Sequence, residues 1–152
     1  ARRVERGEFL FSCDPASDDV IRACAARDRA WITAPIIRVY SELHDRGFAH
    51  SVEAWQDGEL AGGLYGVALG GAFFGESMFY RVSNASKVAL VHLVRQLRAG
   101  GYTLLDTQYS NPHLEQFGVV EIPRDEYEQR LADAICMDPT WWPVNGEAAP
   151  AD

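Results

Sequence analysis

Lysine is almost absent from this chain, because Lys87 is the single lysine among 14 basic residues and the others are arginine. With 22 acidic residues the formal net charge is −8. Proteins that bind nucleic acid through general attraction to phosphates are usually basic, so this charge argues against nonspecific nucleic-acid binding. Arg2, Arg3 and Arg6 still form a local basic group, which is either a phosphate contact or a solvated segment.

Cysteine is also scarce, and Cys13, Cys24 and Cys136 are scattered, with no CxxC pair and no Cys/His cluster at metal-site spacing. We therefore expect free thiols and no bound metal. No apolar run approaches the ~20 residues that cross a bilayer, and no signal-peptide pattern is present. The sequence favours a cytoplasmic protein without membrane contact, and its 152 residues suit one globular domain.

The hydrophobic pattern switches between the two-residue repeat of strands and the three-to-four-residue repeat of helices. Strands are predicted at residues 8–13, 49–56, 60–70, 72–79 and 102–108. Helices are predicted at residues 17–27, 35–46, 84–100, 111–118 and 123–135. The second helix should bury one stripe that contains Ile36, Val39, Tyr40 and Leu43. This order predicts an α+β fold with helices packed on a mixed sheet that contains an antiparallel meander, as in GNAT-type acyltransferases.

The loop RVSNASK (81–87) between the predicted strand and helix contains no glycine. Acetyltransferases of the GNAT type hold the pyrophosphate of acetyl-CoA with a loop whose main chain must approach the phosphates closely, which requires glycine. Helix capping by Ser83 or Asn84 explains the polar residues of this loop. The sequence therefore argues against an acetyl-CoA enzyme, although the helix N-terminus could face another anionic or polar group.

Two polar constellations stand out in the predicted strands. Strict alternation places Glu76 on one face with Phe74 and Met78, where a carboxylate needs a cationic or hydrogen-bonding partner unless that face is solvated. Asp106 and Gln108 share a face at the end of the fifth strand. They either belong to a cleft or bond their own turn, and no histidine joins them in a catalytic triad pattern.

The sequence resembles the leucyl/phenylalanyl-tRNA–protein transferases of bacteria. The segments that carry the resemblance are WIT (31–33), YSELHDRGFAHSVEAWQDGELAGGLYGVALG (40–70), FFGESMFYRVSNASKVAL (73–90), LLDTQ with a following asparagine (104–111) and FGVVEIPRDEY (117–127). The resemblance implies a GNAT-like fold that uses tRNA in place of CoA and needs no cofactor or metal. It implies transfer of leucine or phenylalanine, sometimes methionine, from aminoacyl-tRNA to proteins that begin with arginine or lysine, which marks them for degradation.

The resemblance also assigns residues. Asp106 and Gln108 match the family's catalytic D-x-Q pair, and Glu76 matches its glutamate, which we expect to receive the cationic acceptor. The pocket for the transferred side chain is predicted from Leu64, Phe73, Met78, Leu93, Leu97 and Leu105, with Asn111 as a further substrate contact. The leucines at 64, 93 and 97 replace methionine or phenylalanine of the best-known pattern, which implies a reshaped pocket.

Trp31 matches a tryptophan that stacks on the tRNA 3′ end, although it could equally be a core anchor. Arg2, Arg3 and Arg6 are the predicted tRNA contacts. The family usually carries a small N-terminal domain ahead of this one. Residues 1–145 are predicted to form the aminoacyltransferase domain, and residues 146–152 a flexible tail. Two alternatives remain open: a degenerate relative that binds basic N-termini without transfer, and an acetyltransferase.

Overall fold

The computed structural model describes residues 9–27, 32–108, 112–141 and 147–148. The strands are β1 (Leu10–Cys13), β2 (Ala49–Gln56), β3 (Glu59–Leu69), β4 (Ala72–Tyr80), β5 (Leu104–Asp106) and β6 (Glu147–Ala148). The helices are α2 (Ser17–Arg27), α3 (Ala34–Asp45), α4 (Ala85–Gly100), α5 (Pro112–Glu115) and α6 (Arg124–Ile135). Among these helices none is long and apolar enough to cross a membrane.

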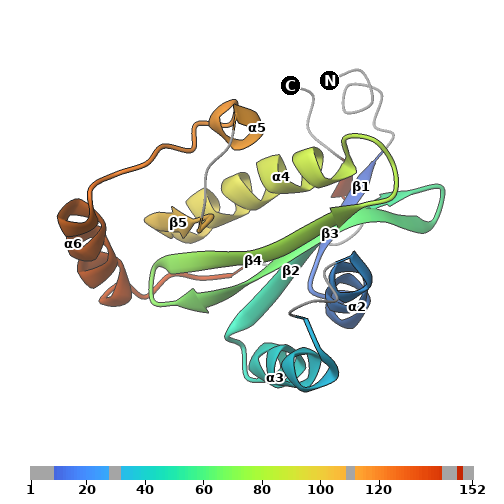
Figure 1. Ribbon diagram of the computed structural model, residues 1–152, viewed down its shortest axis with the longest axis horizontal. Coiled ribbons are helices and arrows are strands. Elements are labelled where there is room, and N and C mark those ends of the chain that lie inside the picture. The colour runs from blue at the N-terminus through green and yellow to red at the C-terminus, as the bar shows by residue number, and fades with distance from the viewer. Residues whose placement is uncertain (1–8, 28–31, 109–111, 142–146, 149–152) are drawn as a thin grey trace.

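The six strands form one mixed sheet in the order β5-β4-β3-β2-β1-β6 (Figure 1). Strands β2, β3 and β4 are the predicted antiparallel meander, and β1 and β6 extend it with antiparallel pairs. Strand β5 pairs with β4 in parallel, with Phe74 opposite Asp106. The chain reaches this parallel position by crossing one face of the sheet through α4, which leaves β5 at the end of the sheet.

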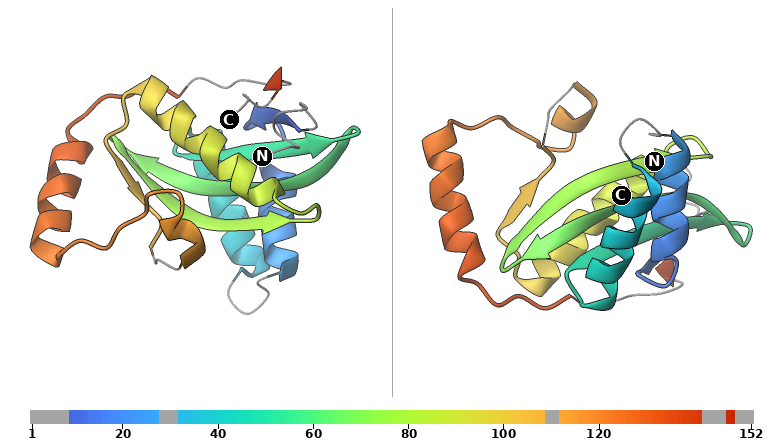
Figure 2. Two further views of the ribbon diagram at one scale, coloured as in Figure 1. Left: turned by 90° about the horizontal axis from the view of Figure 1, so that it is seen from above. Right: turned by 60° about the horizontal axis from the view of Figure 1, so that its bottom comes forward.

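Helices cover both faces of the sheet (Figures 1 and 2). Helix α4 packs on one face and buries Leu90, Leu93 and Leu97 against Phe11 and Phe73. Helices α2 and α3 cover the other face, where the buried cluster contains Val20, Ile21, Cys24, Ala25, Ile32, Tyr65 and Phe79. The sequence therefore folds as an α+β layer structure because α2, α3 and α4 each have one apolar side for the sheet.

The predicted stripe of the second helix is wrong at one position. Val39 of α3 is 57% exposed, whereas Ile36, Ile37 and Tyr40 pack against the buried cluster. A helix on the rim of a sheet needs only a narrow apolar stripe, so the three-residue and four-residue spacing overestimates what it buries.

The predicted alternation in β4 is also wrong, because the strand contains a bulge. Tyr65 pairs with Ser77 but Gly66 pairs with Gly75, which leaves Glu76 as the extra residue. Bulges reverse the facing of the residues that follow. Phe74 and Met78 consequently lie on opposite faces, and Met78 packs on the α4 side together with Phe73.

Some boundaries of the observed strands differ from those predicted from the sequence. The strand expected at 102–108 is ordered as a strand only over Leu104–Asp106. Within the expected tail, Glu147–Ala148 pairs with β1. Asn84 occupies the N-cap position of α4, with φ of 70°, but its side chain makes no capping hydrogen bond, so the predicted side-chain cap is wrong.

Candidate active site

Glu76 on β4, Asp106 at the end of β5 and Gln108 in the turn after β5 form one hydrogen-bonded group. The Gln108 side-chain nitrogen Nε2 donates to the carbonyl oxygen of Gly75 at 2.6 Å and to Glu76 Oε2 at 3.2 Å. The parallel register of β4 and β5 and the bulge at Glu76 bring these residues together although 32 positions separate Glu76 from Gln108. The sequence-predicted polar pair and the isolated glutamate are therefore parts of one arrangement.

The backbone at Gln108 has a left-handed conformation, with φ of 71°. The Asp106 carboxylate stabilises this turn, because Oδ1 accepts the Gln108 backbone N–H at 2.6 Å. A non-glycine residue in this region costs about 1–3 kcal/mol and often marks a functional position. Asp106 thus does bond its own turn, as the plainer interpretation expected, and that bond also aims the Gln108 amide at Glu76.

Two tyrosines from two different helices, α3 and α6, hold the carboxylates of Glu76 and Asp106 in place. Tyr40 of α3 donates its hydroxyl proton to Glu76 Oε1 at 2.7 Å, and Tyr127 of α6 donates to Asp106 Oδ2 at 2.7 Å. Burial and the bond to Glu76 raise the pKa of Tyr40 well above its usual value. The bond to Asp106, with a smaller contribution from burial, raises the pKa of Tyr127 to about 12. Both phenols therefore stay protonated donors at neutral pH.

Sequence reasoning missed both tyrosines as site residues. Tyr40 was predicted only as one member of an apolar stripe, and its ring does pack edge-on against Tyr65, with centroids 5.1 Å apart. Tyr127 lies 21 positions from Asp106 in a helix whose pattern is dominated by charged residues. A tyrosine offers both an apolar ring and a polar tip, so periodicity alone detects the ring and not the hydroxyl.

A small apolar cavity of about 50 Å³ opens beside Glu76. Its lining includes Leu64, Met78, Leu93 and Leu105, four of the six predicted pocket residues. Phe73 and Leu97 belong to the same buried cluster but do not line the cavity. The site thus combines a polar group at the sheet edge with an apolar space directly beneath it.

Five predicted site residues fall outside the described part of the chain: Arg2, Arg3, Arg6, Trp31 and Asn111.

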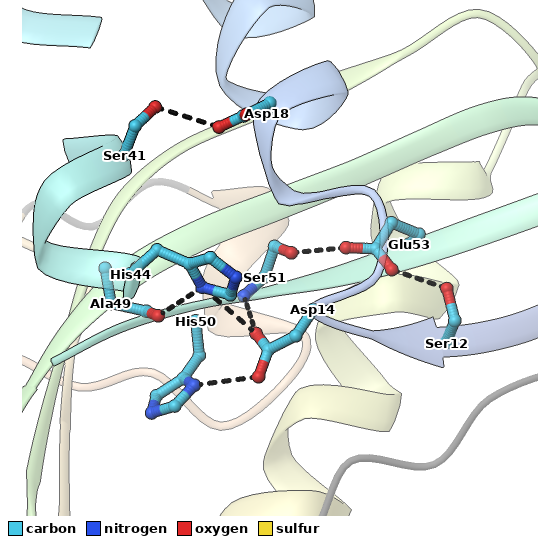
Figure 3. Close-up of polar contacts among 9 residues, drawn as sticks. All are labelled: Ser12, Asp14, Asp18, Ser41, His44, Ala49, His50, Ser51 and Glu53. Atoms are coloured by element: carbon cyan, nitrogen blue, oxygen red, sulfur yellow. Dashed lines mark hydrogen bonds and ion pairs between the residues drawn. The ribbon is translucent and has the colours of Figure 1, made fainter. Parts of the chain in front are cut away.

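A second polar cluster lies around Asp14, next to β1 and β2 and away from the strands β4 and β5 of the candidate site (Figure 3). Asp14 Oδ1 accepts the backbone N–H of Ser51, and Asp14 Oδ2 lies 3.0 Å from His50 Nδ1. His44 Nδ1 lies 2.9 Å from the carbonyl oxygen of Ala49 and 3.8 Å from Asp14. One ligand atom from each of Asp14, His44 and His50 lies within 4.8 Å of the others, close enough to share an ion. Hydrogen bonds within the protein already account for the arrangement, which ties the turn after β1 to β2.

Glu53 of β2, next to this cluster, is a fully buried carboxylate that sequence reasoning did not single out. It accepts hydrogen bonds from the hydroxyl groups of Ser12 and Ser51 (Figure 3). Burial raises its pKa, and the two serine bonds oppose that shift. Its role is structural, because it is shielded from solvent and joins β1 to β2.

The fold is similar to that of an acetyltransferase of known structure. An aminoglycoside acetyltransferase, meta-AAC0020 from an uncultured soil metagenomic sample, superimposes with a TM-score of 0.55 in complex with sisomicin and 0.54 in complex with trehalose. The first alignment covers 86% of this chain and 89% of that chain at 11% sequence identity. The similarity confirms the predicted GNAT-like fold and, at this identity, nothing more specific.

The similarity in sequence is much closer to a different group. The leucyl/phenylalanyl-tRNA–protein transferase of Salinibacter ruber is 68% identical over 152 residues, which cover 99% of this chain and 67% of that protein. The corresponding protein of Gloeobacter violaceus is 61% identical over 135 residues, covering 89% of this chain and 69% of that protein. The sequence profile described as leucyl/phenylalanyl-tRNA protein transferase matches residues 1–132. This chain belongs to the leucyl/phenylalanyl-tRNA protein transferase family.

Proposed function

We propose that this chain transfers leucine or phenylalanine, and in some cases methionine, from aminoacyl-tRNA to proteins whose first residue is arginine or lysine. Such a product carries an N-terminus that marks it for degradation. The observation that carries the proposal is the single group formed by Glu76, Asp106 and Gln108 beside an apolar cavity. The lining of the cavity is apolar like the transferred side chain, but at about 50 Å³ the lining must open to admit leucine or phenylalanine. The polar group suits the amine that attacks the ester.

The reaction forms a C–N bond and breaks the ester C–O bond of the aminoacyl-tRNA. The acceptor α-amine attacks the ester carbonyl carbon and loses a proton, and the ribose hydroxyl leaves with one. Gln108 donates through Nε2 to Gly75 and Glu76, so its Oε1 is the atom that accepts an N–H from the amine. Holding the amine in this way provides the orientation on which such aminolysis depends.

Glu76 supplies the negative charge for a cationic acceptor. Tyr40 donates to one oxygen and Gln108 to the other, so the carboxylate is fixed in place and stays partly exposed. A partly buried carboxylate attracts an arginine or lysine head group more strongly than a fully solvated one. Asp106, fixed by Tyr127 and by the Gln108 backbone, acts by holding Gln108 in its strained turn.

The test is transfer of labelled leucine or phenylalanine from charged tRNA to a peptide that begins with arginine. We expect Asp106→Ala to lower kcat/KM by about 10²-fold or more, because the amide that orients the amine is released. Asp106→Asn, which preserves the side-chain shape, and circular dichroism separate loss of function from loss of fold. Glu76→Gln should raise the acceptor KM and leave the aminoacyl-tRNA KM unchanged.

Two results would contradict the proposal. A wild-type chain that binds peptides beginning with arginine but transfers nothing would be the degenerate binding relative. Acetylation of the same peptide with acetyl-CoA would indicate the acetyltransferase instead, which the glycine-free loop at 81–87 argues against.

A further inference from the structure

A large cavity of about 670 Å³ continues from Asp106 and Gln108 along β5. Its inner wall is six consecutive residues, Thr103 to Gln108, and its outer wall is six more, Phe117 to Ile122. Leu90 and Val94 of α4 and Arg124, Tyr127 and Arg130 of α6 complete the lining. We call this space the β5 slot. Its volume lies in the range of functional ligand sites, well above the 50 Å³ cavity beside Glu76.

The β5 slot borders the open edge of the sheet. Strand β5 is the last strand in the sheet order, and in the described part of the chain it pairs only with β4. An open strand edge presents backbone N–H and C=O groups that another extended chain can pair with. The strand itself is three residues long, Leu104–Asp106, and all three line the space.

The slot also exposes apolar side chains that nothing in the described residues covers fully. Val120 is 74% exposed and Phe117 is 36% exposed, and both line the slot. Exposed apolar groups beside the last strand of a sheet are costly in water and suit a ligand that is itself a polypeptide. Charged side chains in the lining carry both signs, Asp106 and Glu121 against Arg124 and Arg130, so the slot does not select a strongly charged ligand.

We propose that the β5 slot binds the first residues of the acceptor protein as an added, antiparallel strand on β5. This inference rests on the proposed function, because the acceptor amine is placed at Gln108. From there the chain runs back along β5 toward Thr103, opposite to the direction of β5. At about 3.3 Å per residue, the length from Gln108 to Thr103 accommodates about four to five acceptor residues.

Backbone pairing explains how one site can accept many proteins. The first residue is chosen by charge at Glu76, and the following residues are held through main-chain groups that every sequence provides. In an antiparallel pair only alternate residues exchange hydrogen bonds with a given neighbour. The binding of the acceptor should therefore depend on its backbone N–H groups with a period of two.

The test is a series of five-residue acceptors that begin with arginine, each N-methylated at one backbone nitrogen. We expect KM to rise about three- to tenfold at alternate positions and to change little at the positions between them. Val120→Trp, which narrows the slot, should raise the acceptor KM, whereas Leu10→Trp on the exposed side of β1 is the matched control. Lengthening the acceptor beyond about five residues should bring no further gain, since the slot then ends.

A second readout does not require transfer. Amide hydrogen exchange of Leu104–Asp106 should slow when the unmodified peptide is added without tRNA, and should not slow with the peptide methylated at the sensitive positions. Transfer that is equal for every methylated peptide and for Val120→Trp would overturn the slot while the proposed function stands. Slowed hydrogen exchange without transfer would support peptide binding in the slot and contradict the proposed function. The absence of both slowed exchange and transfer would overturn both proposals.

Discussion

Glu76 illustrates what single residues reveal before a structure is known. Its position in an apolar strand predicts a partner, and the structure supplies two, Tyr40 and Gln108. Asp106 and Gln108 are close in sequence, so a local turn was foreseeable. Tyr40 is 36 positions from Glu76, and no local pattern encodes a contact over that distance. The carboxylates of the candidate site were therefore accessible from the sequence, and the hydroxyls that hold them were not.

At the same scale, the buried Glu53 makes a prediction about pH. Burial raises its folded-state pKa above the ordinary 4.5, so above pH 4.5 the folded state binds more protons than the unfolded state. The free energy of unfolding then falls as pH rises through the raised pKa. Relative to wild type, Glu53→Gln should gain stability between pH 4.5 and pH 7, because glutamine carries no charge to bury. Urea unfolding at several pH values measures this difference.

The control for Glu53 is Glu59→Gln at the exposed start of β3. Equal pH slopes for the wild type and the Glu53→Gln variant would contradict the burial of a charge at this position. Loss of all folded structure in Glu53→Gln would instead show that the Ser12 and Ser51 hydroxyls each require one carboxylate oxygen of residue 53 as acceptor. Ser51→Ala, which removes one of the two donors, would then relieve the defect.

At the scale of elements, the order of strands and helices follows from periodicity, and the bulge in β4 does not. The alternating pattern assumes that each residue of a strand faces one residue of its partner. A bulge places two residues opposite one, and the partner strand must have room for it. Here Gly66 of β3 lies opposite Gly75 of β4, next to the extra residue. A Cβ atom at Gly66 would lie 2.4 Å from both Phe73 Cε1 and the Phe74 carbonyl oxygen. The bulge therefore depends on glycine at 66.

We expect Gly66→Ala to lower the free energy of unfolding by about 1–3 kcal/mol, because backbone and a buried ring must move. It should also lower transfer activity, since the bulge positions Glu76. Gly75→Ala is the matched control on the opposite strand, where the nearest atom to a Cβ is the Asp106 carbonyl oxygen at an ordinary 3.6 Å. Denaturant unfolding of both variants measures the contrast, and equal losses would contradict the dependence on Gly66.

At the scale of the whole molecule, the charge is unfavourable for RNA. We expect a chain of net charge −8 to bind the acceptor end of a tRNA through a local basic group, and Arg2, Arg3 and Arg6 are the predicted one. Replacing these three by alanine should raise the aminoacyl-tRNA KM. If each contacts one phosphate, the slope of log affinity against log salt should fall by about 2 to 3. An unchanged slope would place the tRNA elsewhere, and Arg38, Arg46 and Arg98 changed together serve as the control.

The overall architecture was predictable because burial of apolar faces is a property of the whole chain, averaged over many residues. The β5 slot was not, because it arises from the separation of β5 and α6, elements joined by a stretch without strong periodicity. The length of β5 was likewise overestimated, since Asp106 ends the strand by bonding the next turn.

Helix α6 is fastened at two points. Tyr127 donates a hydrogen bond to Asp106 near one end of the helix, and near the other end the Gly71 N–H donates to the Ala134 carbonyl oxygen at 2.6 Å. The helix is thus held in place as one wall of the β5 slot. A polypeptide that reaches Gln108 through the slot must pass between α6 and β5. A tightly folded N-terminus is too bulky for such a passage, so susceptible proteins would be those whose leading residues are already unstructured.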